Sequence, residues 1–308
     1  MSTASTSTSA AADHEPEWLA TLRPHNADCI RRLLSLPAAP SFDHVPKRKQ
    51  AAVAAILYES CDQIRVIMST RALHLRSHPG QASLPGGKVD ASDANVVQTA
   101  LRESVEEIAL PADQAVHLHT GYPFLSKMGL LVHPVVFFLR NGAQILPNLV
   151  ASPSEVADIW STALEAFLSS TAPPEAVLSD PASVDKHRPA QEAFRTYTDI
   201  PWLASVYRLH RFRSSHQLIK GLTADVLISV AQKAYGRNAR YKVEAEGQRS
   251  WEQMVELVVN RYMGPVRAEQ RWGDGESGDA QGSSEAFGTQ IGVDEDDYKE
   301  QLQEDVSV

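Results

Sequence analysis

Short apolar runs separated by polar turns dominate the first half of the chain. Residues 50–59 and 63–69 are rich in Ala, Val and Ile, and the turn between them at 60–62 predicts two paired strands. Residues 116–120 and the almost wholly apolar residues 130–139 predict two further strands.

Apolar side chains that recur every three or four residues predict helices elsewhere. Residues 17–36 show this spacing and stop before Pro37, which predicts an N-terminal helix. Residues 223–235 and 251–262 predict two helices near the C-terminus, and residues 204–212 predict another strand. Strands that alternate with helices in this way favour an α/β fold.

The helix expected at residues 93–109 carries an unusual number of acidic side chains. Three residues that favour helix N-termini lie at its start: Asp90, Ser92 and Asp93. The side chains expected to form its buried stripe are Ala94, Val97, Leu101, Val105 and Ile108. Its carboxylates are expected to project from a different face.

Composition divides the chain into segments. Residues 1–15 are small and polar, which predicts a disordered segment, and residues 16–44 then form a helical extension. The main domain is expected at 45–264, with a proline-rich loop insertion at 172–193. Gly, Asp, Glu and Ser dominate residues 265–308, which predicts an acidic disordered tail.

The net charge of −9 is unevenly distributed. Residues 264–308 carry twelve acidic and three basic side chains, so the rest of the chain has no net charge. Without a basic excess, a nucleic-acid partner has no electrostatic support. Two cysteines are too few for a disulfide framework. No apolar stretch approaches the roughly 18 residues typical of a membrane span, so none is expected.

One run carries the candidate chemistry. A glycine pair, Gly86-Gly87, precedes the acidic helix, on which Glu103, Glu106 and Glu107 occupy positions i, i+3 and i+4. These positions are neighbours on a helix surface, so the carboxylates repel one another by about 0.2–0.5 kcal/mol per exposed pair. Folding alone gives no reason for that arrangement, whereas Mg²⁺ is typically held by carboxylate and phosphate oxygens.

The order of these residues resembles the Nudix box: a glycine is followed by a short loop with an acidic residue and then by Arg-Glu-x-x-Glu-Glu. This box is the signature of Mg²⁺-dependent pyrophosphatases that cut a nucleoside diphosphate linked to another group. The resemblance implies that Glu103, Glu106 and Glu107 bind the metal. It also implies that the Gly87 carbonyl adds a metal ligand and that Arg102 orients the carboxylates during catalysis.

Two departures from the general box are familiar in one branch of the family. Asp93 stands where the box has Glu, and one extra residue separates it from Arg102. A second motif lies directly upstream, where Arg71, Arg76 and Gly80 have the spacing typical of coenzyme A diphosphatases. Guanidinium groups bind phosphate oxygens in bidentate fashion, so the two arginines are candidates for substrate binding beside a metal–phosphate site.

The resemblance covers about residues 45–235 and implies an α/β/α sandwich around a mixed β-sheet. It implies hydrolysis of coenzyme A or acyl-CoA to 3′,5′-ADP and (acyl-)4′-phosphopantetheine, with Mg²⁺ or Mn²⁺ as cofactor. A bound metal lowers the pKa of a water molecule, and a carboxylate takes its proton. The candidates for that base are Glu106, Glu107 and Glu155, among which the sequence does not choose.

Other functions stay open at this point. Ala72, Leu84 and Lys220 depart from the branch pattern, so a Nudix hydrolase for ADP-ribose or a dinucleotide is the first alternative. A catalytically silent Nudix-fold binding module is the second, although the retained glutamates weigh against it. Ala109 replaces the late glycine of the box, a change at the C-terminal end of the helix. The resemblance implies a small-molecule substrate and an intracellular enzyme. It leaves open a homodimer, and a place in the peroxisome, the mitochondrion or the cytoplasm.

Overall fold

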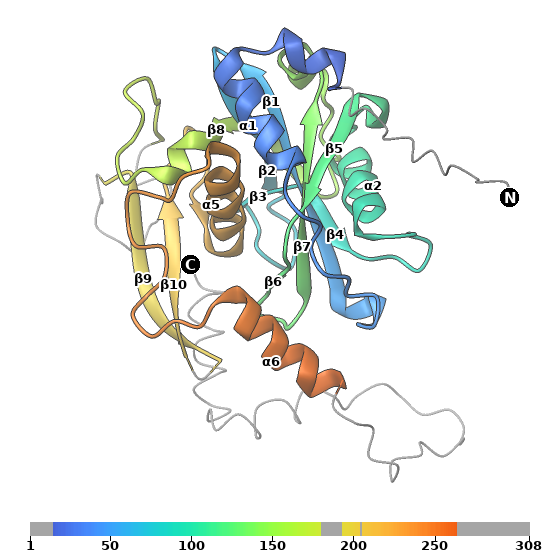
Figure 1. Ribbon diagram of the computed structural model, residues 1–308, viewed down its shortest axis with the longest axis vertical. Helices are drawn as coiled ribbons and strands as arrows, with labels where there is room; N and C mark the ends of the chain where they lie inside the picture. The colour runs from blue at the N-terminus through green and yellow to red at the C-terminus, as the bar shows by residue number, and fades with distance from the viewer. Residues whose placement is uncertain (1–14, 180–192, 204, 264–308) are drawn as a thin grey trace, which may run out of the picture.

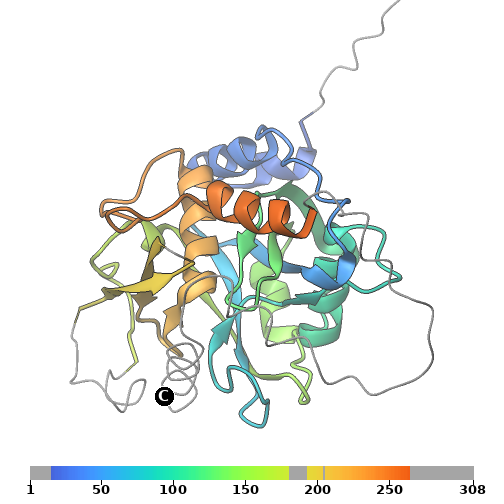
Figure 2. The same cartoon turned by 90° about the horizontal axis from the view of Figure 1, so that it is seen from below.

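The computed structural model describes residues 15–179, 193–203 and 205–263. The expected disordered termini, and most of the loop insertion expected at 172–193, lie outside these ranges, and the expected domain boundaries stay predictions. Within the described ranges the predicted fold class is confirmed, because helices cover both faces of a mixed β-sheet (Figures 1 and 2).

The main sheet contains eight strands of the described chain. They are β1 (Gln50–Ser60), β2 (Gln63–Arg71), β3 (Ala82–Ser83), β4 (Gly86–Lys88), β5 (Ala115–Thr120), β6 (Phe124–Leu125), β7 (Leu131–Leu139) and β8 (Val156–Ala163). Strands β3, β2, β1, β7 and β5 lie side by side in that order, while β4 pairs with β1, β6 with β7 and β8 with β2. Strand β1 is parallel to β7 and antiparallel to β2, so the sheet is mixed.

The four strands predicted in the first half of the chain are confirmed as β1, β2, β5 and β7. The expected turn between β1 and β2 contains Cys61 and Asp62, both in the left-handed region with φ of 50° and 61°. Two such residues in succession match the right-handed twist of a hairpin. Every residue of β7 is buried, which explains its unbroken apolar sequence.

Two helical layers sandwich the sheet. Successive strand residues point to opposite faces, so Ile56 and Phe137 contact the layer of α2 (Val96–Ile108). Leu57 and Phe138 face the opposite layer, which contains α1 (Pro24–Leu34) and α5 (Gly221–Tyr235). The two faces therefore form two separate apolar clusters, one on each side of the sheet.

The single helix predicted at residues 17–36 is wrong. A short 3₁₀ helix, η1 (Glu17–Thr21), is followed by a break, and α1 begins only at Pro24. Proline disfavours helical backbone at the preceding residue, and Arg23 accordingly has φ −58° and ψ 142°. Proline itself is well accepted at the first position of a helix, so the break falls immediately before Pro24.

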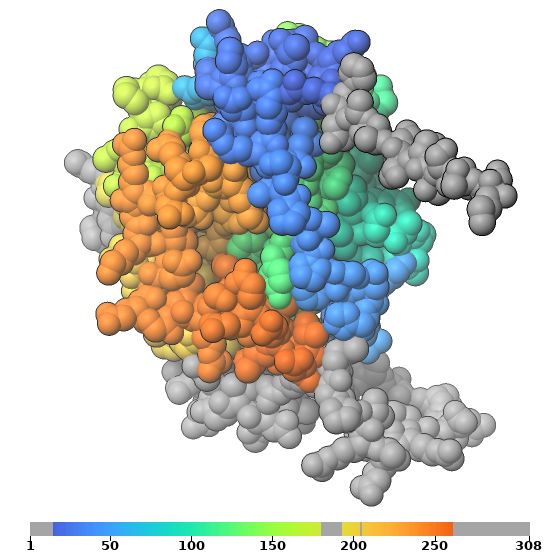
Figure 3. Space-filling view, in the orientation of Figure 1, coloured from blue at the N-terminus to red at the C-terminus, as the bar shows by residue number. Residues whose placement is uncertain are grey.

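A second, three-stranded sheet lies beside α5 and was only partly predicted. It contains β9 (Arg195–Trp202), β10 (Ser205–Phe212) and β11 (Ile219–Lys220), in the order β11-β10-β9. The sequence predicted β10 but missed β9, an edge strand of mixed polarity that contains Pro201. The C-terminal helix α6 (Trp251–Met263) confirms the last predicted helix, and Trp251 packs edge-on against Phe124 of β6. Figure 3 shows the chain between α1 and β1 crossing the same face of the molecule as α5 and α6.

Candidate metal and substrate site

Helix α2 carries the acidic motif; it begins at Val96, later than expected, and its C-terminal end agrees with the expected one within one residue. Its N-cap is Asn95, whose side-chain oxygen accepts the Gln98 N–H at 3.0 Å, so none of the three caps predicted from the sequence serves. Its last residue is Ile108, and the C-cap residue Ala109 adopts the left-handed conformation with φ 53°. Ala109 is the position where the Nudix box has glycine, the residue best suited to that conformation.

The predicted apolar stripe of α2 is confirmed in part, because Val97, Leu101 and Ile108 pack against the core while Ala94 is exposed. Val105 is 42% exposed, whereas Ala100, Ser104 and Glu107 are buried. The small side chains of Ala100 and Ser104 let the helix approach β1 closely, and the Ser104 hydroxyl donates to the Ala100 carbonyl at 2.7 Å. The carboxylate of Glu107 therefore lies on an inward face, against the prediction that all the carboxylates would avoid it.

The glycine pair of β4 allows two close contacts, one between Gly87 and α2 and the other between Gly86 and β1. A Cβ atom on Gly87 would lie 2.5 Å from Oε1 of Glu103, so the missing side chain is the space that the carboxylate occupies. A Cβ on Gly86 would lie 2.3 Å from the backbone oxygen of Ala52, and φ of 155° strains any other residue there. Burial raises the pKa of Glu103, and Arg102 opposes that rise.

Glu107 is the most strongly perturbed acid of the motif. It is 6% exposed, and its pKa is raised to about 8, mainly by burial and in part by Glu103 and Glu155. Arg71 and a hydrogen bond from the Gly86 backbone N–H lower it in part. The charges of Glu103, Glu155 and Arg71 therefore all lie close enough to Glu107 to change its pKa.

Arg102 connects the helix to the loop before it. Its Nε and Nη2 donate to the two carboxylate oxygens of Asp93, each at 3.0 Å, and its Nη1 donates to Glu103 at 2.9 Å and Glu106 at 3.0 Å. Asp93 is 1% exposed and also accepts bonds from the Thr99 hydroxyl and the Asp90 N–H. The Arg102 guanidinium holds the pKa of Asp93 well below its usual range. Asp93 therefore anchors Arg102 and is not the helix cap that was expected.

The other candidate site residues are more exposed than Glu107 or lie on neighbouring loops. Glu106 is exposed and reaches it through Arg102. Arg76 is exposed on the loop between β2 and β3. The N–H of Gly80, with φ 68°, donates to the Arg71 carbonyl at 3.0 Å, which gives this glycine a role in shaping the loop. Glu155 is itself exposed, but its carbonyl accepts the Ala72 N–H at 2.9 Å, which ties it to the end of β2.

Lys47 stabilises the loop that precedes α2, a role that the sequence analysis did not predict. Its Nζ donates to the carbonyls of Ala91 at 2.8 Å and Asp93 at 2.7 Å, so it fixes the loop that leads into α2. A lysine that lies 46 residues before its partner has no local sequence signal, and only the pairing of β4 with β1 brings the two together.

A divalent cation fits the chemistry of the donor set. In the described ranges, no three His, Cys, Asp or Glu side chains already stand close enough together to hold a metal ion. Two of the acids have raised pKa values that they owe in part to neighbouring carboxylates, so a cation among Glu103, Glu107 and Glu155 would relieve that repulsion. The space above Gly87 already accommodates one of these carboxylates.

Comparisons with known proteins identify the family to which the chain belongs. The family model of the Nudix domain matches residues 48–180. A Nudix hydrolase from Enterobacter sp. strain 638, NudL, is 32% identical over 206 residues, which cover 66% of this chain and 92% of that protein. The chain belongs to the Nudix hydrolase family.

Two eukaryotic relatives match over a smaller part of their length. Nudix hydrolase 15, mitochondrial, of Arabidopsis thaliana is 34% identical over 196 residues, which cover 62% of this chain and 60% of the relative. The peroxisomal coenzyme A diphosphatase ndx-8 of Caenorhabditis elegans is 32% identical over 148 residues, 47% of this chain and 61% of the relative. The chain thus spans about three fifths of each. Among the described helices, none has the length and apolar character needed to cross a membrane.

Proposed function

We propose that the chain hydrolyses the diphosphate of coenzyme A or an acyl-CoA, with Mg²⁺ or Mn²⁺ bound. The observation that carries the proposal is Arg71, the first residue of the motif formed with Arg76 and Gly80, which lowers the pKa of Glu107. A guanidinium at that point can pair with a diphosphate whose metal is held by the same acids. The nematode relative named as a coenzyme A diphosphatase supports the substrate class.

The proposed roles follow from the geometry of the chain's own residues. Glu103, Glu107 and the Gly87 carbonyl would hold the metal, with Glu106 at the exposed side. When bound, the metal supplies charge neutralisation at the diphosphate and a water of lowered pKa. The water oxygen forms a bond to one phosphorus, the bridging P–O bond breaks, and both products leave as phosphate monoesters.

Other side chains prepare this step. Glu155 is exposed, yet it shares the environment of Glu107, so it can take the proton of the attacking water. Arg102 holds the Glu103 carboxylate in position, and Asp93 in turn holds Arg102. Glu107 and Glu106 remain alternative candidates for the base.

Product analysis tests the proposal. The full chain is incubated with coenzyme A and Mg²⁺ or Mn²⁺, and the products are separated by anion exchange. We expect 3′,5′-ADP from the unmodified chain and from Glu256→Gln, an exposed change on α6, and at least a hundredfold less from Glu107→Gln. Turnover of ADP-ribose or a dinucleotide without turnover of coenzyme A would refute the substrate. No turnover of any diphosphate by folded protein would favour a binding module instead.

A further inference from the structure

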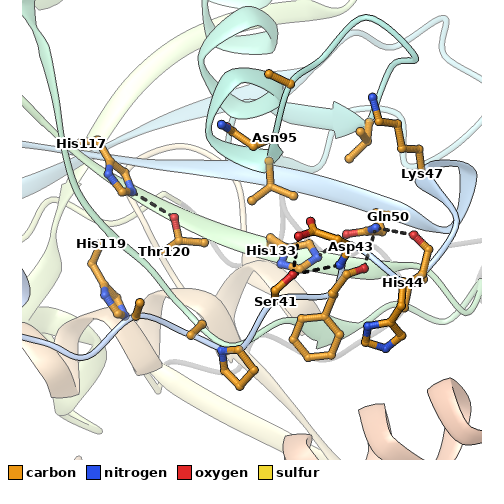
Figure 4. Close-up of a pocket in the computed structure, with 18 of the residues that line it drawn as sticks. Ser41, Asp43, His44, Lys47, Gln50, Asn95, His117, His119, Thr120 and His133 are labelled. Atoms are coloured by element: carbon orange, nitrogen blue, oxygen red, sulfur yellow. Dashed lines mark hydrogen bonds between the residues drawn. The ribbon is translucent and has the colours of Figure 1, made fainter.

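A cavity of about 690 Å³ lies at the N-terminal end of α2 (Figure 4). It is bordered by the segment that leads into β1, by the ends of β5 and β7, and by Asn95 and Val96 at the start of the helix. Val96 and Glu107 stand about 16 Å apart along the helix axis, at about 1.5 Å per residue. The cavity is therefore a different place from the carboxylate group at the other end of α2.

His133 presents a fixed hydrogen-bond acceptor in this cavity. The Gln50 amide nitrogen donates to the carbonyls of Phe42 at 3.2 Å and Val45 at 2.7 Å, so the Gln50 side-chain oxygen is left to accept. It accepts from Nε2 of His133 at 3.0 Å, which assigns the ring proton to that nitrogen. Burial lowers the pKa of His133 to about 4, so the ring is neutral and Nδ1 keeps its lone pair.

Two further polar side chains that line the cavity have hydrogen-bonding atoms that no described residue uses. His119 is 8% exposed, and its ring makes no hydrogen bond to the part of the chain that is described. Burial lowers its pKa to about 4, so it offers one donor and one acceptor. Asn95 uses its oxygen to cap α2, which leaves its Nδ2 hydrogens for a ligand. Neither His119 nor His133 is among the described side chains with a fully buried atom that lacks a partner, so their free ring nitrogens are accessible to a ligand.

The charge balance excludes several ligand classes. Among the described lining residues Lys47 carries a positive charge, but it is held by two backbone carbonyls and balanced by the Asp43 carboxylate, so the lining favours an uncharged ligand over an anion. An aliphatic ligand would leave His119 and His133 unpaired.

What fits is an uncharged planar heterocycle with both donors and acceptors. The Phe42 ring lies edge-on to His133 at a centroid distance of 5.7 Å, and Leu118 and Val96 add apolar wall. We propose that this cavity binds an adenine base, whose exocyclic amine donates to Nδ1 of His133 and whose ring nitrogens accept from Asn95. The base could belong to the substrate of the proposed function or to a separate adenine nucleotide, and the base-binding site itself does not require the hydrolysis.

Calorimetry with adenosine tests the site directly. The full chain is titrated in the presence of EDTA, so binding is measured without turnover. We expect adenosine to bind and inosine to bind about tenfold more weakly, because inosine lacks the amine that pairs with His133. Asn95→Asp keeps a helix-capping oxygen and removes the donor, so it should also weaken adenosine binding about tenfold.

A matched pair of tryptophan variants fixes the location. Ala39 lines the cavity, so Ala39→Trp should fill it and abolish adenosine binding, whereas Ala112→Trp, exposed on another part of the surface, should leave binding unchanged. Absence of adenosine binding at millimolar concentration, or equal binding by Ala39→Trp and the unmodified chain, would overturn the proposal. Failure of coenzyme A hydrolysis would leave this result untouched.

Kinetics separate the two sources of the base. If the cavity holds the base of the substrate, adenosine competes with coenzyme A, and Asn95→Asp raises KM with little change in kcat. If it holds a separate nucleotide, adenosine binds without competing. Either pattern supports an adenine site, and calorimetry alone decides whether the site exists.

Discussion

The Arg102 guanidinium binds both oxygens of the Asp93 carboxylate, with Nε–Oδ1 and Nη2–Oδ2 distances of 3.0 Å each. Asp93 is almost wholly buried, while Arg102 continues to Glu103 and Glu106 on the helix. A bidentate pair has fixed geometry as well as charge. The loop before α2 and the acidic face of α2 are therefore held in one arrangement by a single side chain.

Replacing Asp93 should destabilise the fold. Asp93→Asn removes the negative charge and leaves a partly buried guanidinium without its main partner, so we expect the free energy of unfolding to fall by about 3 kcal/mol. Urea denaturation at pH 7 measures the change. The control is Asp90→Asn, three residues away and exposed, which should change stability by less than about 0.5 kcal/mol. Equal effects of the two variants would contradict the anchoring role.

The two glycines of β4 should respond differently to alanine. In Gly87→Ala the new Cβ meets only the end of the Glu103 side chain, which can move, so stability should change by less than about 1 kcal/mol. The displaced carboxylate should lower metal-dependent hydrolysis about a hundredfold. In Gly86→Ala the Cβ meets the backbone of β1, so the fold itself should be lost or strongly destabilised. Thermal melting and product formation, measured on both variants, distinguish these outcomes.

The two arginines of the upstream motif should not contribute equally. Arg71 lowers the pKa of Glu107 and so lies within the influence of the carboxylates, whereas Arg76 is exposed on the loop. We expect Arg71→Gln to lower kcat/KM for coenzyme A about a hundredfold, and Arg76→Gln about tenfold or less. Steady-state kinetics on both variants provide the comparison. A larger loss for Arg76→Gln would mean that the loop rearranges when substrate binds.

The sequence predicted the elements that depend on local pattern and missed relationships between distant segments. Strand β7 is apolar throughout because both its faces are covered, so its sequence identified it. The acidic motif likewise predicted that Glu103 and Glu107 share one helix, and α2 confirms this. In contrast, the close approach of α2 to β1 buries Ala100 and leaves Val105 exposed, a result of packing that helical periodicity cannot reveal. The role of Lys47 depends on a contact across 46 residues.

Acid should weaken the fold through His210. This ring is fully buried; its Nδ1 accepts from Arg195 at 3.0 Å and its Nε2–H donates to the Val243 carbonyl at 2.8 Å. Burial lowers its pKa to about 4, against about 6.5 in an unfolded chain. Between these values the unfolded state binds more protons, so the free energy of unfolding should fall as the pH falls from about 6.5 to 4.

The size of this effect can be bounded and assigned. A pKa difference of about 2.5 units corresponds to about 3 kcal/mol as an upper limit for one histidine. His210→Gln should remove that part of the pH dependence, although the variant will be less stable at pH 7. Urea denaturation across pH 4–7 measures the slope, with the exposed His25→Gln as control. An unchanged slope in His210→Gln would assign the acid sensitivity to other groups.

Glycine at position 109 should stabilise the chain. Ala109 closes α2 in the left-handed conformation with φ 53°, and its N–H donates to the Val105 carbonyl at 3.0 Å. An L-residue with a Cβ pays about 1 kcal/mol to adopt this conformation, whereas glycine does not. Ala109→Gly should therefore raise the free energy of unfolding by up to about 1 kcal/mol, less the extra entropy that glycine gives the unfolded chain. The exposed Ala112→Gly, whose backbone is not left-handed, should be neutral or destabilising in the same urea titration. The same loss of stability in both variants would mean that Ala109 adopts the left-handed conformation without cost, and that the departure from the Nudix box at this position has no energetic consequence.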